Sequence, residues 1–214
     1  MVLGIYGSGG FGREVKEIAE TCDSWEELIF IDDTVEEGMF QGIKRVPLEL
    51  FCNRYRPEKA KVVIAVGEPK YKRELYNKVK KEGYLFANVI DSRSNISPSA
   101  KIGTGIVIYA GAFVSSNVII ENNVCIGLNT IIGHDCIIYQ HCQIAPGVIF
   151  GGRCVVESGA YIGLNVPVKE DTSIGANTVV GMGSVVLRDI PENVIALGNP
   201  ARAMKHKDDK NVFQ

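Results

Sequence analysis

The chain has 214 residues, of which 46% are hydrophobic, and its 23 basic and 25 acidic residues give a formal net charge of −2. This length supports one or two domains with a sizeable core, and the balanced charge offers no basic excess for nucleic acid. No apolar run approaches the roughly 18 residues of a membrane span, and the N-terminus lacks the pattern of a signal peptide. We therefore expect a cytoplasmic protein that neither inserts into a membrane nor binds nucleic acid.

Short apolar strands alternate with helices over residues 1–91. This alternation favours a small parallel α/β sheet, because parallel strands need crossover helices between them. Strands are expected at 2–6, 28–31, 61–66 and 85–90, and helices at 13–22 and 71–81.

A glycine turn, Gly-Ser-Gly-Gly-Phe-Gly at residues 7–12, joins the first strand to the first helix and matches G-x-G-x-x-G. Asp32 follows 20 residues after the last glycine, which is the context of a dinucleotide fold. The segment is too short for both mononucleotide halves, so NAD binding stays an alternative, as does a tight turn without a ligand. The glycines would also let a phosphate or a sugar approach the helix N-terminus, where free N–H groups favour negative charge.

From residue 96 onward the sequence follows a six-residue repeat. Every sixth residue is Ile or Val, with one Phe: Ile96, Ile102, Ile108, Val114, Ile120, Ile126, Ile132, Ile138, Ile144, Phe150, Val156, Ile162, Val168, Ile174, Val180 and Val186. Such a period predicts a solenoid in which short strands turn their aliphatic residue inward and glycine-rich turns form the corners. Three hexads complete one triangular coil.

The phase of the repeat sorts cysteines and histidines by their expected place. Four residues after each aliphatic residue comes a second inward position, which small residues favour. Cys136, Cys142 and Cys154 lie at this position, where cysteine acts as an apolar filler. No Cys-x-x-Cys pair exists, so we expect no metal site. His134 and His141 fall at turn positions and are expected to project outward. Cys125 directly precedes an inward position and is expected to face out, and His206 belongs to a charged, solvated tail.

The repeat resembles the left-handed β-helix of hexapeptide acyltransferases, and the segment 197–202, Leu-Gly-Asn-Pro-Ala-Arg, resembles that family's closing signature. Fused to a short Rossmann-like domain, it is similar to the sialic acid O-acetyltransferase family and its nucleotide-amino-sugar N-acetyltransferase members. This resemblance rests on the glycine turn and on the segments 30–33, 65–67 and 132–136. It implies a Rossmann-like nucleotide-sugar domain at 1–91, a left-handed β-helix at 92–191, and a closing segment with a tail at 192–214.

The same resemblance implies a homotrimer, with acetyl-CoA bound between neighbouring β-helices, and it assigns roles to individual residues. Catalysis would fall to His134 as the general base and Asp135 as its partner. Nucleotide-sugar binding would involve Ser8, Gly9, Gly10, Asp32, Asp33 and Gly67. Coenzyme contacts would come from Gln143, Gly152, Gly163, Gly181, Gly183 and Lys205. Two positions depart from the family pattern, since Phe11 and Gln143 each stand where many members have histidine.

The function that we expect is acetyl-CoA-dependent N-acetylation of a nucleotide-linked amino sugar in the synthesis of bacterial surface glycans or glycoproteins. One alternative is O-acetylation of sialic acid or of a related sugar hydroxyl. A second alternative is a trimeric scaffold without catalysis, in which the glycine turn binds a regulatory ligand. The sequence names neither the sugar nor the nucleotide.

Overall fold

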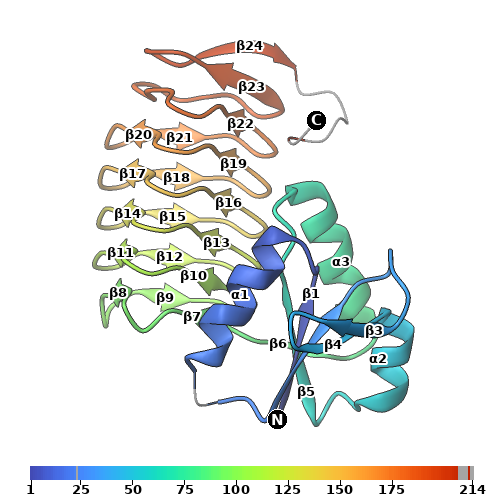
Figure 1. Cartoon of the computed structure of the whole chain (residues 1–214). Coiled ribbons are helices and arrows are strands. Elements are labelled where there is room, and N and C mark those ends of the chain that lie inside the picture. Colours follow the sequence, from blue (N-terminus) through green and yellow to red (C-terminus); the bar gives the residue numbers. More distant parts are fainter. Residues whose placement is uncertain (23, 207–211, 213–214) are drawn as a thin grey trace.

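The computed structural model describes residues 1–22, 24–206 and 212. An α/β sheet built from the N-terminal part lies beside the lower coils of a tall stack of parallel strands (Figure 1). Among the described residues, no helix is long and apolar enough to cross a membrane.

The N-terminal sheet has six strands in the order β3-β4-β2-β1-β5-β6. Its elements are β1 (Val2–Tyr6), α1 (Gly10–Glu20), β2 (Glu27–Ile31), β3 (Gly38–Phe40), β4 (Ile43–Val46), α2 (Leu48–Arg54), β5 (Ala60–Ile64), α3 (Pro69–Lys81) and β6 (Leu85–Phe86). The central strand β1 pairs in parallel with both β2 and β5, and its residues are buried on both faces. The parallel α/β sheet is therefore confirmed, while the hairpin β3–β4 and helix α2 were not predicted.

The strand expected at 85–90 is two separate strands. β6 completes the N-terminal sheet, whereas β7 (Val89–Ile90) already pairs with a coil strand. Asn88 marks the change of sheet, because its side chain accepts a hydrogen bond from the Ile106 N–H at 3.0 Å and donates one to the Gly103 carbonyl at 2.8 Å. The regular coils thus begin one hexad before Ile96.

Three parallel sheets form the faces of the stack. The interdomain sheet contains β7, β10 (Val107–Ile108), β13 (Cys125–Ile126), β16 (Gln143–Ile144), β19 (Tyr161–Ile162), β22 (Val179–Val180), β23 (Val194–Leu197) and β24 (Arg202–His206). The second sheet contains β8 (Asn95–Ile96), β11 (Phe113–Val114), β14 (Ile131–Ile132), β17 (Ile149–Phe150) and β20 (Pro167–Val168). The third contains β9 (Lys101–Ile102), β12 (Ile119–Ile120), β15 (Ile137–Ile138), β18 (Val155–Val156) and β21 (Ser173–Ile174).

The coil interior confirms the phase of the repeat. Aliphatic side chains stack in ladders such as Ile108, Ile126, Ile144 and Ile162, all fully buried. Burying each such side chain stabilises the fold by roughly 1.5–3 kcal/mol. Cys136, Cys142 and Cys154 fill the small inward position without exposure, as predicted.

The stack ends less regularly than the repeat suggests. Val186 and Ile190 make single bridges to the coil below instead of two-residue strands. β23 then pairs in parallel with β22, and β24 pairs antiparallel with β23. This pair covers the upper edge of the interdomain sheet, where an open strand would otherwise present unpaired N–H and C=O groups.

Helices α1 and α3 cover the lower part of the interdomain sheet. Cys125 faces out of the coil, as expected, but α1 covers it and leaves it 1% exposed. The Tyr109 hydroxyl donates to the Glu14 carboxylate of α1 at 2.7 Å, and Arg73 of α3 donates to Asn177 at 2.8 Å. Apolar packing and hydrogen bonds therefore join the two parts of the chain.

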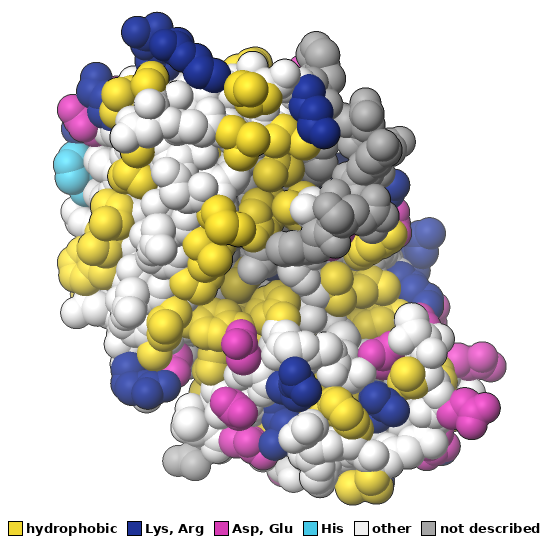
Figure 2. All heavy atoms as spheres, turned by 45° about the horizontal axis from the view of Figure 1, so that its top comes forward, with side chains coloured by type: hydrophobic (Ala, Val, Ile, Leu, Met, Phe, Trp, Pro, Cys, Tyr) yellow, Lys and Arg dark blue, Asp and Glu magenta, His cyan; other side chains and the backbone are white. Residues whose placement is uncertain are grey.

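Apolar side chains that point away from the coils are exposed on two other surfaces, and Figure 2 shows hydrophobic groups spread over the β-helix half. We call the aligned outer residues of the second sheet the second-sheet stripe: Phe113, Ile131, Ile149 and Pro167. The first three are 41–48% exposed. A corner ladder runs beside it, consisting of Leu128, Pro146, Leu164 and Met182. Contiguous exposed apolar surface of this kind marks an interaction site.

Candidate functional site

The glycine turn forms one wall of a cavity of about 570 Å³ at the carboxyl ends of β1, β2 and β5. Ligands of parallel α/β sheets bind at this edge. All six residues expected to hold a nucleotide-sugar line the cavity, namely Ser8, Gly9, Gly10, Asp32, Asp33 and Gly67. We call it the turn cavity.

The glycines of the turn serve two purposes. Gly7 has a φ of +115°, and a Cβ added to Gly12 would lie 1.9 Å from the Gly7 carbonyl oxygen. These two glycines therefore allow α1 to begin close to β1. A Cβ at Gly9 would contact nothing within 4 Å, so space is open in front of the α1 N-terminus, where free N–H groups favour a negatively charged ligand.

Asp32 holds the turn together. Its carboxylate accepts hydrogen bonds from the Ser8 hydroxyl at 2.5 Å and from the Thr34 hydroxyl at 2.6 Å. Partial burial raises the pKa of Asp32, but these hydrogen bonds outweigh burial and leave the pKa below its usual value. The carboxylate is therefore charged at neutral pH.

Asp33 is held by different donors. Its carboxylate accepts hydrogen bonds from the Tyr6 hydroxyl at 2.6 Å and the Leu48 N–H at 2.8 Å, and it pairs with Lys78. Burial again raises the pKa of Asp33, and again the donors lower it further than burial raises it. The two acids thus differ in surroundings although they are adjacent in sequence.

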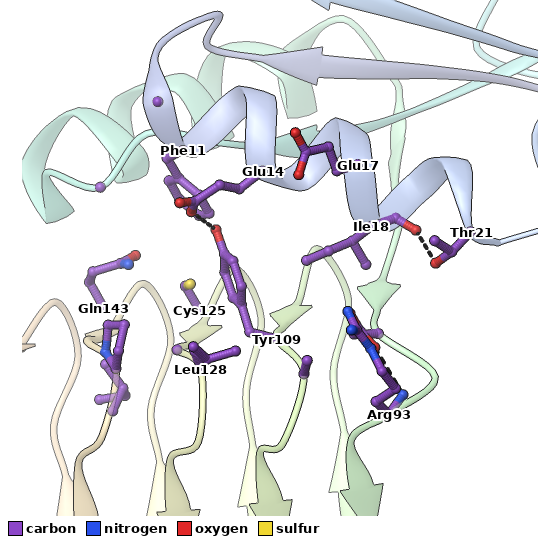
Figure 3. Close-up of a pocket in the computed structure, with 17 residues that line it drawn as sticks. Phe11, Glu14, Glu17, Ile18, Thr21, Arg93, Tyr109, Cys125, Leu128 and Gln143 are labelled. Atoms are coloured by element: carbon purple, nitrogen blue, oxygen red, sulfur yellow. Dashed lines mark hydrogen bonds and ion pairs between the residues drawn. The ribbon is translucent and has the colours of Figure 1, made fainter.

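A second cavity, of about 770 Å³, lies between α1 and the interdomain sheet (Figure 3). It shares Gly10, Phe11 and Gly67 with the turn cavity, so the two adjoin at the start of α1. Phe11 stacks on Tyr109 with ring centroids 6.3 Å apart, and this apolar contact replaces the polar side chain that the family resemblance favours there. We call this space the interdomain cavity.

Sequence reasoning did not find the interdomain cavity. Its walls come from outward coil positions, including Tyr109 and Leu128, and from the acidic face of α1. Glu14 reaches toward Tyr109, and Glu17 lies one turn further along the helix (Figure 3). From the sequence alone, Glu14 and Glu17 of α1 are expected to face solvent, because the interdomain sheet that packs beside this helix is not known at that point. A bulky aromatic residue at an outward coil position, such as Tyr109, was the available signal.

His134 lies in the turn between β14 and β15, and its side chain is 51% exposed. Its Nδ1 lies 2.7 Å from Asp135 Oδ2, and Asn117 donates to the other carboxylate oxygen at 3.0 Å. The hydrogen bond from His134, followed by that from Asn117, lowers the pKa of Asp135. The carboxylate therefore places the imidazole proton on Nδ1 and leaves Nε2 free to accept a proton.

Gly152 belongs to the next coil and lies directly against the His134 ring. A Cβ at this position would lie 2.5 Å from Cε1 and 2.6 Å from Nε2. The absence of a side chain therefore allows the ring to lie flat against the backbone. Within the described chain, the Gly152 N–H donates to no other group.

The remaining residues expected to meet the coenzyme lie in surroundings that recur along the whole β-helix and its closing segment. A Cβ at Gly163 or Gly181 would collide with the next coil, and Gly183 adopts a φ of +67° at a turn. Coil geometry alone accounts for these glycines, so their contact with a coenzyme stays a prediction. Lys205 lies exposed on β24.

His141 does not project into solvent, contrary to expectation, because α3 covers its corner and leaves it 5% exposed. Asn123 Nδ2 donates to the Lys72 carbonyl at 3.2 Å and approaches His141 Nδ1 at 2.9 Å. Nδ1 must therefore be the acceptor, and the proton lies on Nε2. The ring also packs edge-on against Tyr76, so His141 is part of the contact between α3 and the coils.

Burial, with smaller contributions from Arg73 and Lys72, lowers the pKa of His141 to about 4. Between this value and about 6.5, the pKa of an unfolded histidine, the unfolded chain binds more protons. Lowering the pH from 7 to 5 should therefore destabilise the fold by on the order of 1–2 kcal/mol through this residue. Urea unfolding of the wild type and of His141→Gln at both pH values measures the difference. Equal losses in the two proteins would contradict the assignment.

The structure does not bring the predicted site residues together within one chain. His134 lies at the corner between the second and third sheets, whereas α1 and the turn cavity lie beside the interdomain sheet. In a triangular coil, that corner is opposite the interdomain sheet. Gln143 lies on β16 in the interdomain cavity, apart from His134 and Gly152.

Comparison with solved structures covers both parts of the chain. The acetyltransferase domain of PglB from Neisseria gonorrhoeae FA1090, in complex with acetyl coenzyme A, aligns with a TM-score of 0.90 and 28% identity over 95% of this chain and 98% of that chain. The chain is similar along nearly its whole length to hexapeptide-repeat sugar acetyltransferases. Residues 2–79 match the PglD N-terminal domain, and the coil stack is the left-handed β-helix of this family.

Two further solved structures are similar along nearly their whole length. PerB from Caulobacter crescentus, in complex with CoA and GDP-perosamine, has a TM-score of 0.89 and 27% identity over 96% of this chain and 98% of its own. WeeI from Acinetobacter baumannii AYE has a TM-score of 0.89 and 28% identity over 95% and 100% of the two chains. The combination of glycine-turn domain and β-helix is therefore a feature that this chain shares with these proteins.

Proposed function

We propose that the protein transfers an acetyl group from acetyl-CoA to the amino group of a nucleotide-linked sugar in the cytoplasm. The observation that carries the proposal is the His134–Asp135 pair, which leaves Nε2 free on a ring that lies against Gly152. The similar PerB structure contains CoA and GDP-perosamine. Free thiols packed in the core, as in Cys136 and Cys154, are usual in proteins of reducing compartments.

Few groups are needed for this reaction. Acetyl-CoA supplies the acetyl group as an activated thioester. The amine nitrogen bonds to the thioester carbonyl carbon, and the C–S bond breaks. His134 Nε2 accepts the proton that the amine loses, Asp135 stabilises the imidazolium, and the departing thiolate of coenzyme A takes up that proton. We assign to the Gly152 N–H the binding of the oxygen on which negative charge develops, because this group has no other acceptor in the described chain. In the N-terminal part, the open face of the glycine turn receives the nucleotide phosphates.

Acidic side chains favour an amine as the acceptor over a hydroxyl. Glu14 and Glu17 line the interdomain cavity, and Glu14 accepts a hydrogen bond from the Tyr109 hydroxyl. Two carboxylates attract the ammonium form of an amino sugar and would repel the carboxylate of a sialic acid. N-acetylation is therefore preferred over the O-acetylation that the sequence left open.

We infer a homotrimer, because one chain does not contain a complete site. His134 of one chain has to meet the turn cavity of a neighbour, since its own lies on the opposite side of the coil. The second-sheet stripe lies next to the His134 corner, and the corner ladder lies at the other edge of the same sheet. Together they provide the apolar surface that such an interface needs. A ring of three chains would then contain three equivalent sites.

The proposal is tested by thiol release from acetyl-CoA in the presence of amino-sugar nucleotides, with free sialic acids as the comparison. We expect thiol release above the hydrolysis background only with an amino-sugar nucleotide. Release with sialic acids alone would favour O-acetylation. If no acceptor releases thiol and acetyl-CoA does not raise the melting temperature, the protein is not this enzyme.

A further inference from the structure

Lys72 of α3 is a completely buried lysine between the two parts of the chain. Its side chain is 0% exposed, and its ammonium lies 5.9 Å from the centre of the Phe11 ring. Burial lowers the pKa of Lys72, and the neighbouring groups that oppose this effect are the thiols of Cys125 and Cys142. No carboxylate in the described chain pairs with it. Burying a lysine without such a partner is costly, so this position calls for a specific role.

One side chain accepts a hydrogen bond from Lys72. The Lys72 ammonium donates to Gln143 Oε1 at 3.3 Å. An ammonium has only donors, so the amide of Gln143 has to turn its oxygen toward Lys72. Its NH₂ group is then directed away from Lys72 and toward the thiol of Cys125, with which Gln143 makes a hydrogen bond. Both residues line the interdomain cavity (Figure 3).

This contact also makes the amide a better donor. A hydrogen bond to the oxygen of an amide polarises its N–H groups, and a surrounding of low dielectric strengthens the effect. One amide hydrogen of Gln143 meets the Cys125 thiol, and the second is the fixed donor that the cavity offers to an oxygen acceptor. Without Lys72 the amide could rotate and present its oxygen instead.

We propose that Lys72 is a positioning residue for acetyl transfer: it orients Gln143 so that the amide N–H donates to the carbonyl oxygen of the bound acyl thioester. This inference rests on the proposed function and on the neighbour's His134 corner reaching the interdomain cavity. Lys72 itself lies outside both cavities, so it acts through Gln143 and touches no substrate.

Steady-state kinetics of Lys72→Met, Gln143→Met, the double variant and Gln143→Glu test the proposal. Each single change should lower kcat by about 10- to 100-fold, as loss of one oriented donor does. The double variant should be no slower than Gln143→Met, because the two residues act as one unit. Gln143→Glu keeps an acceptor for Lys72 but has no donor, so it should fold well and lose activity. Lys72→Arg should recover most of kcat.

Lys81→Met, an exposed lysine on the same helix, is the matched control and should match the wild type. Wild-type kcat in Gln143→Glu would overturn the donor role, and full additivity in the double variant would overturn the link to Lys72. An increase in the KM for acetyl-CoA with unchanged kcat would overturn the contact with the thioester carbonyl. If the wild type releases no thiol, the proposed function fails, and calorimetric binding of acetyl-CoA to the same variants still tests the pair.

Discussion

Replacing His134 with Asn should lower kcat by about 10²- to 10⁴-fold, which is the usual contribution of a general base. Asn can still donate toward Asp135, but it cannot accept the proton that the amine loses. The residue is half-exposed on the surface of the coil, so the fold should be unaffected. The measurement is single-turnover and steady-state thiol release at saturating acetyl-CoA.

The same substitution at His141 is the matched control, because that histidine is buried under α3 and packs against Tyr76. His141→Asn should lower the melting temperature but reduce kcat by less than about tenfold. A larger fall in kcat for His141→Asn than for His134→Asn would show that His141, and not His134, is the general base. Equal activity of His134→Asn and the wild type would leave the corner without a catalytic role.

Mixing two inactive variants should restore activity if each site is shared between chains. One variant lacks the base, as in His134→Asn, and the other blocks the glycine turn, as in Gly9→Trp. In randomly mixed trimers, about a quarter of the sites would combine an intact His134 with an intact turn. Activity should therefore recover to about a quarter of the wild-type value after unfolding and refolding the variants together.

Each variant refolded alone provides the background for this experiment. A mixture as inactive as the separate variants would show that both groups act within one chain, which contradicts the proposed site. Recovery in a preparation that sedimentation shows to be monomeric would contradict the trimer instead.

The β-helix was predictable because its determinant is local and repeated. Every sixth residue is aliphatic, with one Phe, and small residues fill a second inward position. The phase alone therefore assigned Cys136, Cys142 and Cys154 to the core, and the structure buries all three. The alternating pattern of the N-terminal part was also local. The hairpin β3–β4 was not, since its few residues of mixed polarity gain their order from pairing with β2.

Burial of outward positions could not be predicted in the same way. The phase correctly turned Cys125 and His141 away from the coil interior, but only the tertiary contact with α1 and α3 decides that they are covered. Such contacts join segments far apart in the chain, and no periodic pattern encodes them. The interdomain cavity was missed for the same reason, whereas the turn cavity follows from one local motif.

Asp135 belongs to a ladder of turn residues with left-handed backbone conformation, whose other members are Asn117, Arg153 and Asp171. Successive members are 18 residues apart, and each coil advances about 4.8 Å along the axis. Positions along the β-helix axis are therefore separated by multiples of one coil spacing. The height of His134 above the N-terminal part can change only by whole coils, since any shorter insertion would rotate the histidine away from its corner. Variation in substrate size within such a scaffold has to be met by the N-terminal part.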